Sequence, residues 1–280
     1  MKISGFSFGR NLIELDYPVV ESITSVLPLV DEFIFNAGDS RDATTDLVRS
    51  ITSPKLRIIS SVWDDSLRKN GLIFSEQAKI AFHHCSGEWA LFVNADEVIH
   101  EKDYEPIRKA LQKYQDQAQI LGLMFRYYHF DADFWSLNPW RYHKEIRLVR
   151  NDGRVEPCGD MSGFLAVADK RYLKSGPAER WAFSDAHIYH YGWVRKNPEI
   201  MLERNRRLEY YYHDDSYLRQ NYGGKQEFDY EYYDALKEFR GTHPAVMEGR
   251  VARSSRFRKR RNRWLNFRFY KEVFTHGFKG

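Results

Sequence analysis

The chain has 280 residues, of which 42% are hydrophobic and 16% aromatic, and its formal net charge is +4 at pH 7. This length allows one large α/β domain with an appended segment, or two small domains, and the hydrophobic content allows a substantial core. No stretch approaches the roughly 18 apolar residues of a membrane-spanning helix, and the two cysteines stand in no spacing that indicates a zinc site or a disulfide framework.

The first 130 residues alternate between short apolar runs, which predict strands, and longer stretches with helical spacing. The first of these runs has the pattern of a strand and not of a signal peptide. The predicted strands cover residues 2–8, 33–35, 56–59, 89–93 and 120–128. The predicted helices cover residues 11–28, 43–51, 73–86 and 103–116. This alternation predicts a mostly parallel sheet with helices on both faces.

The alternation stops beyond residue 130. The pattern there predicts, in chain order, a strand over 141–150, a loop-rich stretch over 155–175, a strand-like piece rich in His and Tyr over 186–193, and a helix over 198–213. We therefore expect an α/β domain that spans residues 1–195. A mainly helical C-terminal segment, 196–280, is expected to follow it.

Two polar clusters, residues 36–42 and 94–97, follow directly after predicted strands. Ligands of parallel sheets bind outside the carboxyl ends of the strands, so both clusters should lie on the same rim. Mg²⁺ and Mn²⁺ take oxygen ligands, usually one or two carboxylates together with substrate phosphates. A metal held by the acids of the second cluster could neutralise a diphosphate leaving group. The spacing alone fits acids that cap a following helix equally well.

Two segments carry a resemblance to family 2 glycosyltransferases. Residues 33–44 read FIFNAGDSRDAT and are similar to the family's first nucleotide-binding segment. Residues 87–97 read GEWALFVNADE and are similar to its second segment, which ends in DxDE. The segments stand in the family's order, and with the β/α alternation the resemblance covers roughly residues 1–130. It implies the GT-A fold and metal-assisted transfer of a sugar from a nucleotide-diphosphate donor, with a UDP-sugar favoured and inversion favoured over retention.

The family's donor contacts carry over position by position. Asn36 stands where an Asp usually contacts the base, and Asn94 where the first Asp of DxD meets the ribose. Asp96 matches the last Asp, which binds the metal, Mn²⁺ or Mg²⁺. An amide at position 94 can still hydrogen-bond ribose hydroxyls, but it weakens any metal role there. The other positions that match donor-contacting segments are Phe6, Ser7, Arg10, Asp42, Arg68 and Gln77; for Asp42 a structural role is the alternative.

The second half resembles a bacterial subgroup that acts on lipopolysaccharide core and related surface glycans. The matching pieces read IRLVRN over 146–151 and IYHYGW over 188–193, with an acid near 160 between them. This resemblance implies a glycan or lipid-linked acceptor and a general base that deprotonates its hydroxyl group. Asp160 is the candidate base, with Asp185 and Glu156 as alternates. A solvated loop acid is the other interpretation of Asp160.

His190 is the candidate second metal ligand, because neutral imidazole often binds metals and several GT-A enzymes complete their site with a late His. A structural histidine in a short strand is the alternative. His187 should point to the opposite face of an extended segment, so at most one of the two reaches the metal. Two aromatic stretches, 127–130 and 134–135, could form a platform for acceptor sugars or be packing. Arg141 and Arg147 could hold phosphate or an acidic acceptor, or form salt bridges.

A basic tail covers residues 250–268, where no acid interrupts the basic side chains. Aromatic residues interleave with them, as in basic amphipathic helices on anionic membranes. Cys85 and Cys158 are expected to be free thiols, which favours the reducing cytosol. The tail favours a protein that is peripheral to the inner face of the membrane. A plain solvated helix is the alternative. No nucleic-acid partner is expected, because no recognisable module accompanies the basic residues.

Two rival functions stay open. One is a catalytically inactive protein that keeps the GT-A fold and binds nucleotide or carbohydrate; Asn94 favours it and the two acids after it oppose it. The other is a nucleotidyltransferase, which usually begins with a Gly-rich loop bearing Arg and Lys. Residues 5–10 read GFSFGR and are too poor in glycine for that loop.

Overall fold

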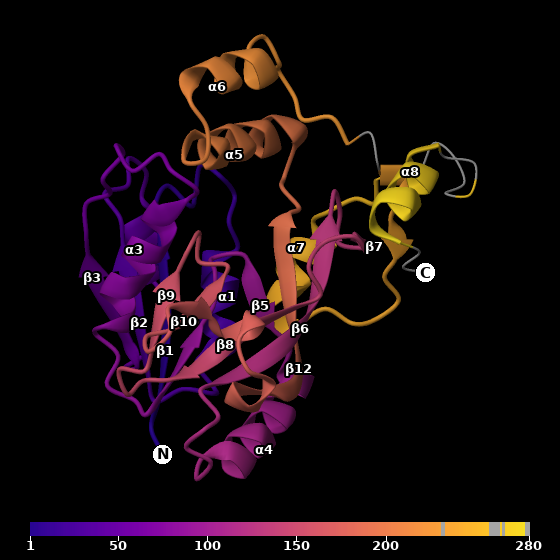
Figure 1. The fold of residues 1–280 in the computed structure, drawn as a ribbon. Coiled ribbons are helices and arrows are strands. Elements are labelled where there is room, and N and C mark those ends of the chain that lie inside the picture. Colours follow the sequence, from indigo (N-terminus) through magenta and orange to yellow (C-terminus); the bar gives the residue numbers. More distant parts are fainter. Residues whose placement is uncertain (231–232, 258–263, 265–266, 278–280) are drawn as a thin grey trace.

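The computed structural model describes residues 1–230, 233–257, 264 and 267–277. Its centre is a 10-stranded sheet with helices on both faces (Figure 1). Four parallel strands form the N-terminal half of this sheet in the order β3-β2-β1-β4. They are β1 (Ile3–Gly9), β2 (Glu32–Ala37), β3 (Leu56–Ser60) and β4 (Trp89–Phe92). The mostly parallel α/β architecture predicted from the sequence is confirmed.

The other strands extend the sheet beyond β4. Strand β8 pairs antiparallel with β4 and with β6, and the long β12 lies parallel to β6 and antiparallel to β5. The bounds of these strands are β5 (Glu97–Ile99), β6 (Gly122–Asp131), β7 (Ser136–Leu137), β8 (Lys144–Arg150), β12 (Trp181–Trp193) and β13 (Lys237–Glu238). The region predicted to be loop-rich instead contains a small three-stranded sheet of β9 (Val155–Cys158), β10 (Gly163–Ala166) and β11 (Arg171–Tyr172).

Strand alternation sends the apolar side chains of the sheet to two separate cores. In β2, Phe33 and Phe35 join the core under α1, α2 and α4, whereas Ile34 joins the core under α3. These four helices are α1 (Val19–Val26), α2 (Thr44–Arg49), α3 (Leu72–Phe82) and α4 (Tyr104–Tyr114). Because helices cover both faces of the parallel strands, β1, β2 and β4 are mostly buried and rich in apolar residues, which makes these strands recognisable in the sequence.

The first helix is shorter than predicted. The apolar spacing predicted a helix over residues 11–28, but residues 10–16 form a loop and α1 begins at Val19. Asn11 and Asp16 have left-handed backbone angles (φ 57° and 52°), which a right-handed helix does not allow. Leu12 lies in this loop, but its side chain is buried in the core, which explains the helix-like spacing of the apolar residues.

The C-terminal part of the chain contains α5 (Pro198–Tyr210), α6 (Asp215–Tyr222), α7 (Glu248–Ala252) and α8 (Phe267–His276). Helices α5 and α6 lie together beyond one end of the sheet, and α8 lies apart from them (Figure 1). The domain boundary at residue 195 stays a prediction. Among the helices of the described residues, none combines the length and hydrophobicity that a membrane crossing requires. Cys85 and Cys158 are free thiols.

Candidate functional site

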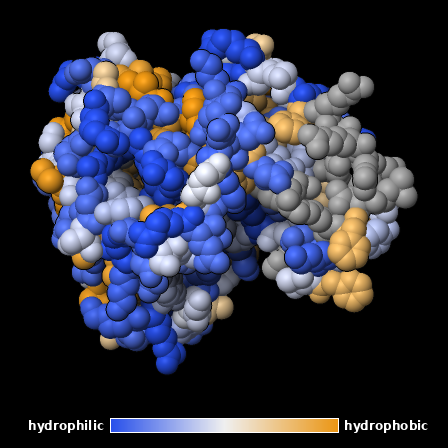
Figure 2. Space-filling view, turned by 90° about the horizontal axis from the view of Figure 1, so that it is seen from above, coloured by the Kyte–Doolittle hydropathy of each residue, from blue (hydrophilic) through white to orange (hydrophobic). Residues whose placement is uncertain are grey.

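A pocket of about 590 Å³ lies at the carboxyl ends of β1 and β4, and residues of α5 line it as well. Seen from the side of α5 and α6, the molecular surface is mostly hydrophilic and is hollowed (Figure 2). Arg41 from the first predicted polar cluster and Asn94 and Asp96 from the second all line this pocket. The two clusters therefore share one rim, as the order of strands and helices predicted.

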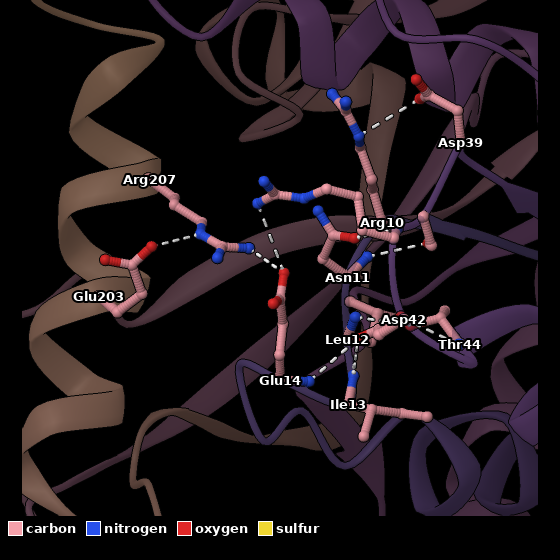
Figure 3. A network of polar contacts seen from close by, with 12 residues as sticks. Arg10, Asn11, Leu12, Ile13, Glu14, Asp39, Asp42, Thr44, Glu203 and Arg207 are labelled. Atoms are coloured by element: carbon pink, nitrogen blue, oxygen red, sulfur yellow. Dashed lines mark hydrogen bonds and ion pairs between the residues drawn. The ribbon is translucent and has the colours of Figure 1, made fainter.

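The loop after β1 forms part of the pocket wall, and Asp42 holds it in place (Figure 3). The Asp42 carboxylate accepts hydrogen bonds from the backbone N–H groups of Ile13 and Glu14, both at 3.0 Å, and from the hydroxyl group of Thr44. Asp42 is not itself a lining residue. These hydrogen bonds support the structural alternative for Asp42, and its donor contact stays a prediction.

The same loop is tied to α5. Arg207 donates to the carboxylates of Glu14 and Glu203, and Figure 3 shows this bridge between the loop and the helix. Arg68 makes a second connection, from the segment after β3: it pairs with Asp215 at 2.7 Å and donates to the carbonyl groups of Tyr210 and His213. Arg68 does not line the pocket, so its role here is to fix the C-terminal end of α5.

Asp96 and His190 face each other in the pocket. The Nε2 atom of His190, on β12, lies 3.7 Å from Oδ1 of Asp96, which follows β4. Both side chains are largely buried, and burial lowers the pKa of His190 to about 3, so its imidazole is neutral at pH 7. Gly192 leaves room for the pair, because a Cβ atom there would lie 2.5 Å from Nε2 of His190 and 3.0 Å from Oδ2 of Asp96.

A second histidine fixes the tautomer of His190. Nε2 of His129 lies 2.6 Å from the carbonyl oxygen of Tyr142, which only accepts, so this nitrogen carries a proton. In the neutral ring Nδ1 of His129 is then an acceptor, and Nδ1 of His190, 3.0 Å away, donates to it. The lone pair of His190 consequently resides on Nε2, which is the atom that faces Asp96. Burial lowers the pKa of His129 to about 2, which keeps this ring neutral as well.

Glu97, the acid adjacent to Asp96, points away from the pocket. Its two oxygens pair with the guanidinium group of Arg147 at 3.0 and 3.1 Å, and one also accepts a 2.8 Å hydrogen bond from the Tyr127 hydroxyl group. Glu97 and Arg147 are both fully buried. Burial opposes ionisation of Glu97, but the charge and hydrogen bonds of Arg147 outweigh it and lower the pKa of Glu97 to about 2. Of the two alternatives for Arg147, the structure shows the salt bridge.

Asp96 shares its surroundings with two arginines. Nη2 of Arg195 lies 3.7 Å from Oδ2 of Asp96, and Arg204 on α5 lines the same pocket. Burial raises the pKa of Asp96 above its ordinary value, and the positive charges of Arg195 and Arg204 offset part of this increase. The pocket lining here therefore combines the Asp96 carboxyl group, the neutral imidazole of His190 and the guanidinium group of Arg204, with Arg195 buried behind Asp96.

Asp160, between β9 and β10, also lines the pocket. Its carboxylate accepts hydrogen bonds from the Tyr212 hydroxyl group at 2.7 Å and from the backbone N–H of Ser162 at 3.1 Å. The alternates are placed elsewhere: Asp185 is exposed and pairs with Arg126, and Glu156 is not among the lining residues.

An aromatic cluster lines another part of the pocket. Trp63 lies within 6.0 Å of Phe8, Phe74 and Tyr211, measured between ring centroids. Arg10 lies against Trp63 and pairs with Asp65 at 2.7 Å and with Asp39 at 3.3 Å. Flat apolar faces beside polar groups of both charges suit a ligand with a ring system and hydrogen-bonding edges.

Four residues predicted to contact the donor, Phe6, Ser7, Asn36 and Gln77, lie beneath the pocket, and their donor contacts stay predictions. Phe6 is fully buried, with its ring 5.1 Å from that of Phe92. Ser7 and Asn36 are buried in the sheet, and the Asn36 amide donates to the side chain of Gln77 at 3.0 Å, so these polar groups point inward. None of the four is among the lining residues. Of the predicted site residues, the pocket brings together Arg10, Asn94, Asp96, Asp160 and His190.

The two aromatic stretches proposed for an acceptor platform are packing instead. Phe130 and Phe134 belong to a buried cluster around Tyr191. Tyr128 stacks on His187, whose ring lies 3.6 Å from an Asp103 oxygen and away from the pocket lining, as the opposite-face argument predicted.

Several residues that line the pocket are not predicted from the sequence, among them Tyr17, Trp63, Asp65, Arg204 and the aromatic residues 210–212. The available signal was the helix predicted over 198–213, which combines arginines and tyrosines unusually densely for a solvated helix. Only its packing across the end of the sheet shows which of them face the pocket.

Asp96 and His190 alone are too few side chains to hold a metal ion. Within the part of the chain that the structure describes, no group of three or more His, Cys, Asp or Glu side chains is arranged around one point. A cation bound between Asp96 and His190 would need further ligands from a substrate or from water.

Comparison with known proteins gives one family. The model of the family described as glycosyl transferase family 2 matches residues 17–173, more than half of the chain. No curated protein matches the chain. Similar solved structures include S. aureus TarS, with a TM-score of 0.41 and 17% identity over 74% of this chain and 39% of that chain. The chain thus spans well under two thirds of that TarS chain.

Two further structures are similar at the same level. S. aureus TarS 1–349 in complex with UDP-GlcNAc gives a TM-score of 0.43 and 16% identity, over 84% of this chain and 70% of that chain. Glucosyl-3-phosphoglycerate synthase from Mycobacterium tuberculosis, in complex with Mn²⁺, UDP and phosphoglyceric acid, gives a TM-score of 0.42 and 13% identity, over 76% of this chain and 80% of that chain.

Proposed function

The chain belongs to glycosyl transferase family 2, and we propose that it transfers a sugar from a nucleotide-diphosphate donor, with UDP favoured, to a hydroxyl group of a glycan or glycolipid. It has the GT-A α/β fold, with its pocket at the carboxyl ends of parallel strands. One observation carries the proposal: a single pocket joins Asp96, His190 and Asp160 with the Trp63 aromatic cluster. This combination offers groups for a base, for a diphosphate and for an acceptor hydroxyl.

Asp160 is the proposed general base. In an inverting transfer its carboxylate accepts the proton of the acceptor hydroxyl group while the acceptor oxygen bonds to the anomeric carbon. The bond between that carbon and the β-phosphate oxygen breaks, and its electron pair leaves with the nucleoside diphosphate. The hydrogen bond from Tyr212 supports this role, because it holds the Asp160 carboxylate at the pocket wall.

Asp96 and His190 are the proposed metal ligands. A carboxylate oxygen and a neutral imidazole nitrogen suit Mn²⁺, and Mg²⁺ would rely more on the carboxylate and on donor oxygens. When bound, the cation would stabilise the negative charge of the departing diphosphate. The residues fit this role because Nε2 of His190 bears its lone pair toward Asp96 and Gly192 keeps the space between them open.

Removing the second histidine should weaken metal binding without touching a ligand. His129→Phe removes the acceptor that fixes the tautomer of His190, so we expect Mn²⁺ affinity in the presence of UDP to fall by about 10–100-fold. Titration followed by electron paramagnetic resonance of free Mn²⁺ measures the affinity, and ¹⁵N NMR reports which ring nitrogen of His190 is protonated. His187→Phe is the matched control. An unchanged Mn²⁺ affinity in His129→Phe, or a protonated Nε2 on His190 in the wild type, would contradict this role.

A panel of nucleotide sugars tests the proposed function. Each donor is added with and without Mn²⁺, and the melting temperature is recorded, because a ligand that binds only the folded state raises it. We expect a UDP-sugar to give the largest increase and to be hydrolysed slowly when no acceptor is present. If no nucleotide sugar stabilises the protein, the proposal fails.

The panel also addresses the inactive alternative. Asn94, at the position where the family usually has Asp, favours a protein that binds nucleotide without turnover, and Asn94 does line the pocket. Stabilisation by a donor with no hydrolysis and no transfer to any glycan or glycolipid tested would support that alternative.

We also propose that the protein works at the cytoplasmic face of a membrane through its C-terminal segment. Helix α8 exposes two phenylalanines, Phe267 (83%) and Phe274 (92%), which lie two turns apart. Several predicted basic residues of the tail, Arg258, Lys259, Arg260, Arg261 and Arg263, lie outside the described residues. Arg250, the first basic residue of the tail, is engaged within the protein. It pairs with Asp16 and Glu21 and connects α7 to the N-terminal half of the molecule.

Cosedimentation with vesicles tests this membrane proposal. Vesicles that contain phosphatidylserine should bind the protein at low salt, and the double variant Phe267→Ser/Phe274→Ser should bind them more weakly. Val62→Ser, which removes an exposed apolar side chain elsewhere, is the control. Equal binding to neutral vesicles, or no loss in the double variant, would overturn the proposal.

A further inference from the structure

Two buried arginines beside Asp96 are not explained by the roles assigned so far. The side chain of Arg195 is fully buried and its Nη2 atom lies 3.7 Å from Asp96. Arg204, on α5, is 7% exposed and lines the pocket. Burying a guanidinium group costs free energy unless an anion and hydrogen-bond acceptors compensate its charge. Each of these two arginines therefore needs such partners.

The protein itself supplies few acceptors to Arg195. Its Nη1 atom donates to the carbonyl groups of Tyr191 and Val194, at 2.9 and 2.7 Å. Its Nε and Nη2 atoms, both buried, have no hydrogen-bond partner among the described residues. The charge of Arg195 is therefore poorly compensated by the polypeptide at a position directly behind Asp96.

Arg204 is bonded only to neutral groups. It donates to the hydroxyl group of Tyr17 at 3.3 Å and to the side-chain oxygen of Asn205 at 2.9 Å. Among the described residues, no carboxylate lies within ion-pairing distance of Arg204, whereas Arg206 and Arg207 on the same helix both pair with Glu203. Asp96 is the one acid shared by Arg195 and Arg204, so the cluster has more positive than negative charge.

Tyr17 holds the two guanidinium groups together. Arg195 lies 4.3 Å from the centre of the Tyr17 ring, and Arg204 binds the hydroxyl group of the same residue. Tyr17 lines the pocket as well. Two cations fixed on one rigid side chain form a preorganised receptor for an anion with more than one negative charge.

The geometry points to the diphosphate of the donor as this anion: Arg204 binds it directly from the pocket lining, the buried charge of Arg195 behind Asp96 adds to the attraction, and the nucleotide enters before the metal. This inference rests on the proposed function. A divalent cation beside Asp96 and His190 would meet two positive charges in a poorly solvated site if the diphosphate were absent. Once the diphosphate lies between them, its charge offsets both the arginines and the cation. Metal affinity should therefore depend on the nucleotide, whereas the nucleotide should bind without metal.

Arg204→Gln tests the inference because it should change two affinities in opposite directions, weakening the binding of UDP and strengthening the binding of Mn²⁺ alone. Isothermal titration in the presence of EDTA should show a loss of UDP affinity of about tenfold to a hundredfold, with uridine affinity unchanged, because uridine lacks the diphosphate. Binding of Mn²⁺ alone should strengthen by about threefold or more, because a repelling charge is gone. A merely structural role would weaken all of these together.

Two further variants control the test. Arg204→Lys keeps the charge, so it should retain more UDP affinity than Arg204→Gln and leave the binding of Mn²⁺ alone weak. Arg219→Gln removes the same charge from the exposed side of α6, outside the pocket lining, and should leave all three affinities unchanged. Equal UDP affinity in wild type and Arg204→Gln, or weaker Mn²⁺ binding in that variant, overturns the inference. If the wild type binds neither UDP nor any nucleotide sugar, the proposed function itself has failed.

Discussion

If Asp96 is the proposed metal ligand, Asp96→Asn is expected to reduce the rate constant of sugar transfer by about 10²–10³-fold, because it removes the charge that would place a cation against the departing diphosphate. The fold should survive, since the amide has the same shape and the side chain of Asp96 accepts no hydrogen bond from the other described residues, its nearest charged neighbours being 3.7 Å away. Transfer is measured as release of UDP from the donor found in the panel. Asp46→Asn, an exposed change on α2, is the control.

The stability of Asp96→Asn gives a second, independent readout. Burial raises the pKa of Asp96. A carboxyl group whose pKa is raised by folding favours the folded state below its unfolded pKa, and this contribution is lost as the pH rises through the folded pKa. At pH 7, which is above the unfolded pKa, this carboxyl group therefore opposes folding, and the variant should melt at the same temperature as the wild type or higher. Full activity in Asp96→Asn would refute the assigned role, whereas lost activity with a large loss of stability would indicate damage to the fold.

Unlike Asp96→Asn, Glu97→Gln is expected to destabilise the fold, with a loss of about 3–5 kcal/mol in the free energy of unfolding. The substitution leaves the Arg147 guanidinium group buried without its counter-charge, in a place where both side chains are at most 1% exposed. Urea denaturation at pH 7 measures the loss. Glu88→Gln, with a side chain that is 65% exposed, should cost little. Replacing both partners by apolar residues, as in Glu97→Leu/Arg147→Met, should recover part of the stability.

The same ion pair predicts how stability depends on acid. Because folding lowers the pKa of Glu97 from 4.5 to about 2, the contribution of this carboxylate is complete above pH 4.5 and is lost as the pH falls toward 2. Stability measured at pH 3 and at pH 7 should therefore differ less in Glu97→Gln than in the wild type. An equal difference in the two proteins would show that another group causes the acid sensitivity.

The position of Asp96 was predictable from local sequence, but the roles of its neighbours were not. An apolar run followed at once by polar residues identifies a strand end, and this places Asp96 on the rim. Nothing local indicates that Glu97, one residue later, turns inward, because its partner Arg147 lies 50 positions along the chain. The relation between His187 and His190 was predictable, since strand alternation is a local property.

Contacts between distant segments account for the other differences. Leu12 fits the helical spacing because it reaches the same core as α1, although it lies in a loop. Phe6 and Asn36 stand in segments that resemble donor-binding ones, but each strand has two faces, and the sequence does not reveal which face a given side chain joins. Arg204 becomes a pocket residue only because α5 packs across the end of the sheet.

The placement of α5 separates two tasks within one pocket. Asp96 belongs to the segment that the family model covers, whereas Arg204 and the tyrosines at 210–212 follow it in the chain. A graft of residues 198–213 from a related enzyme could therefore change which molecules are admitted while the strand-end carboxylate stays where it is. One continuous piece of polypeptide thus supplies a whole wall of the pocket and can be exchanged without cutting into the sheet.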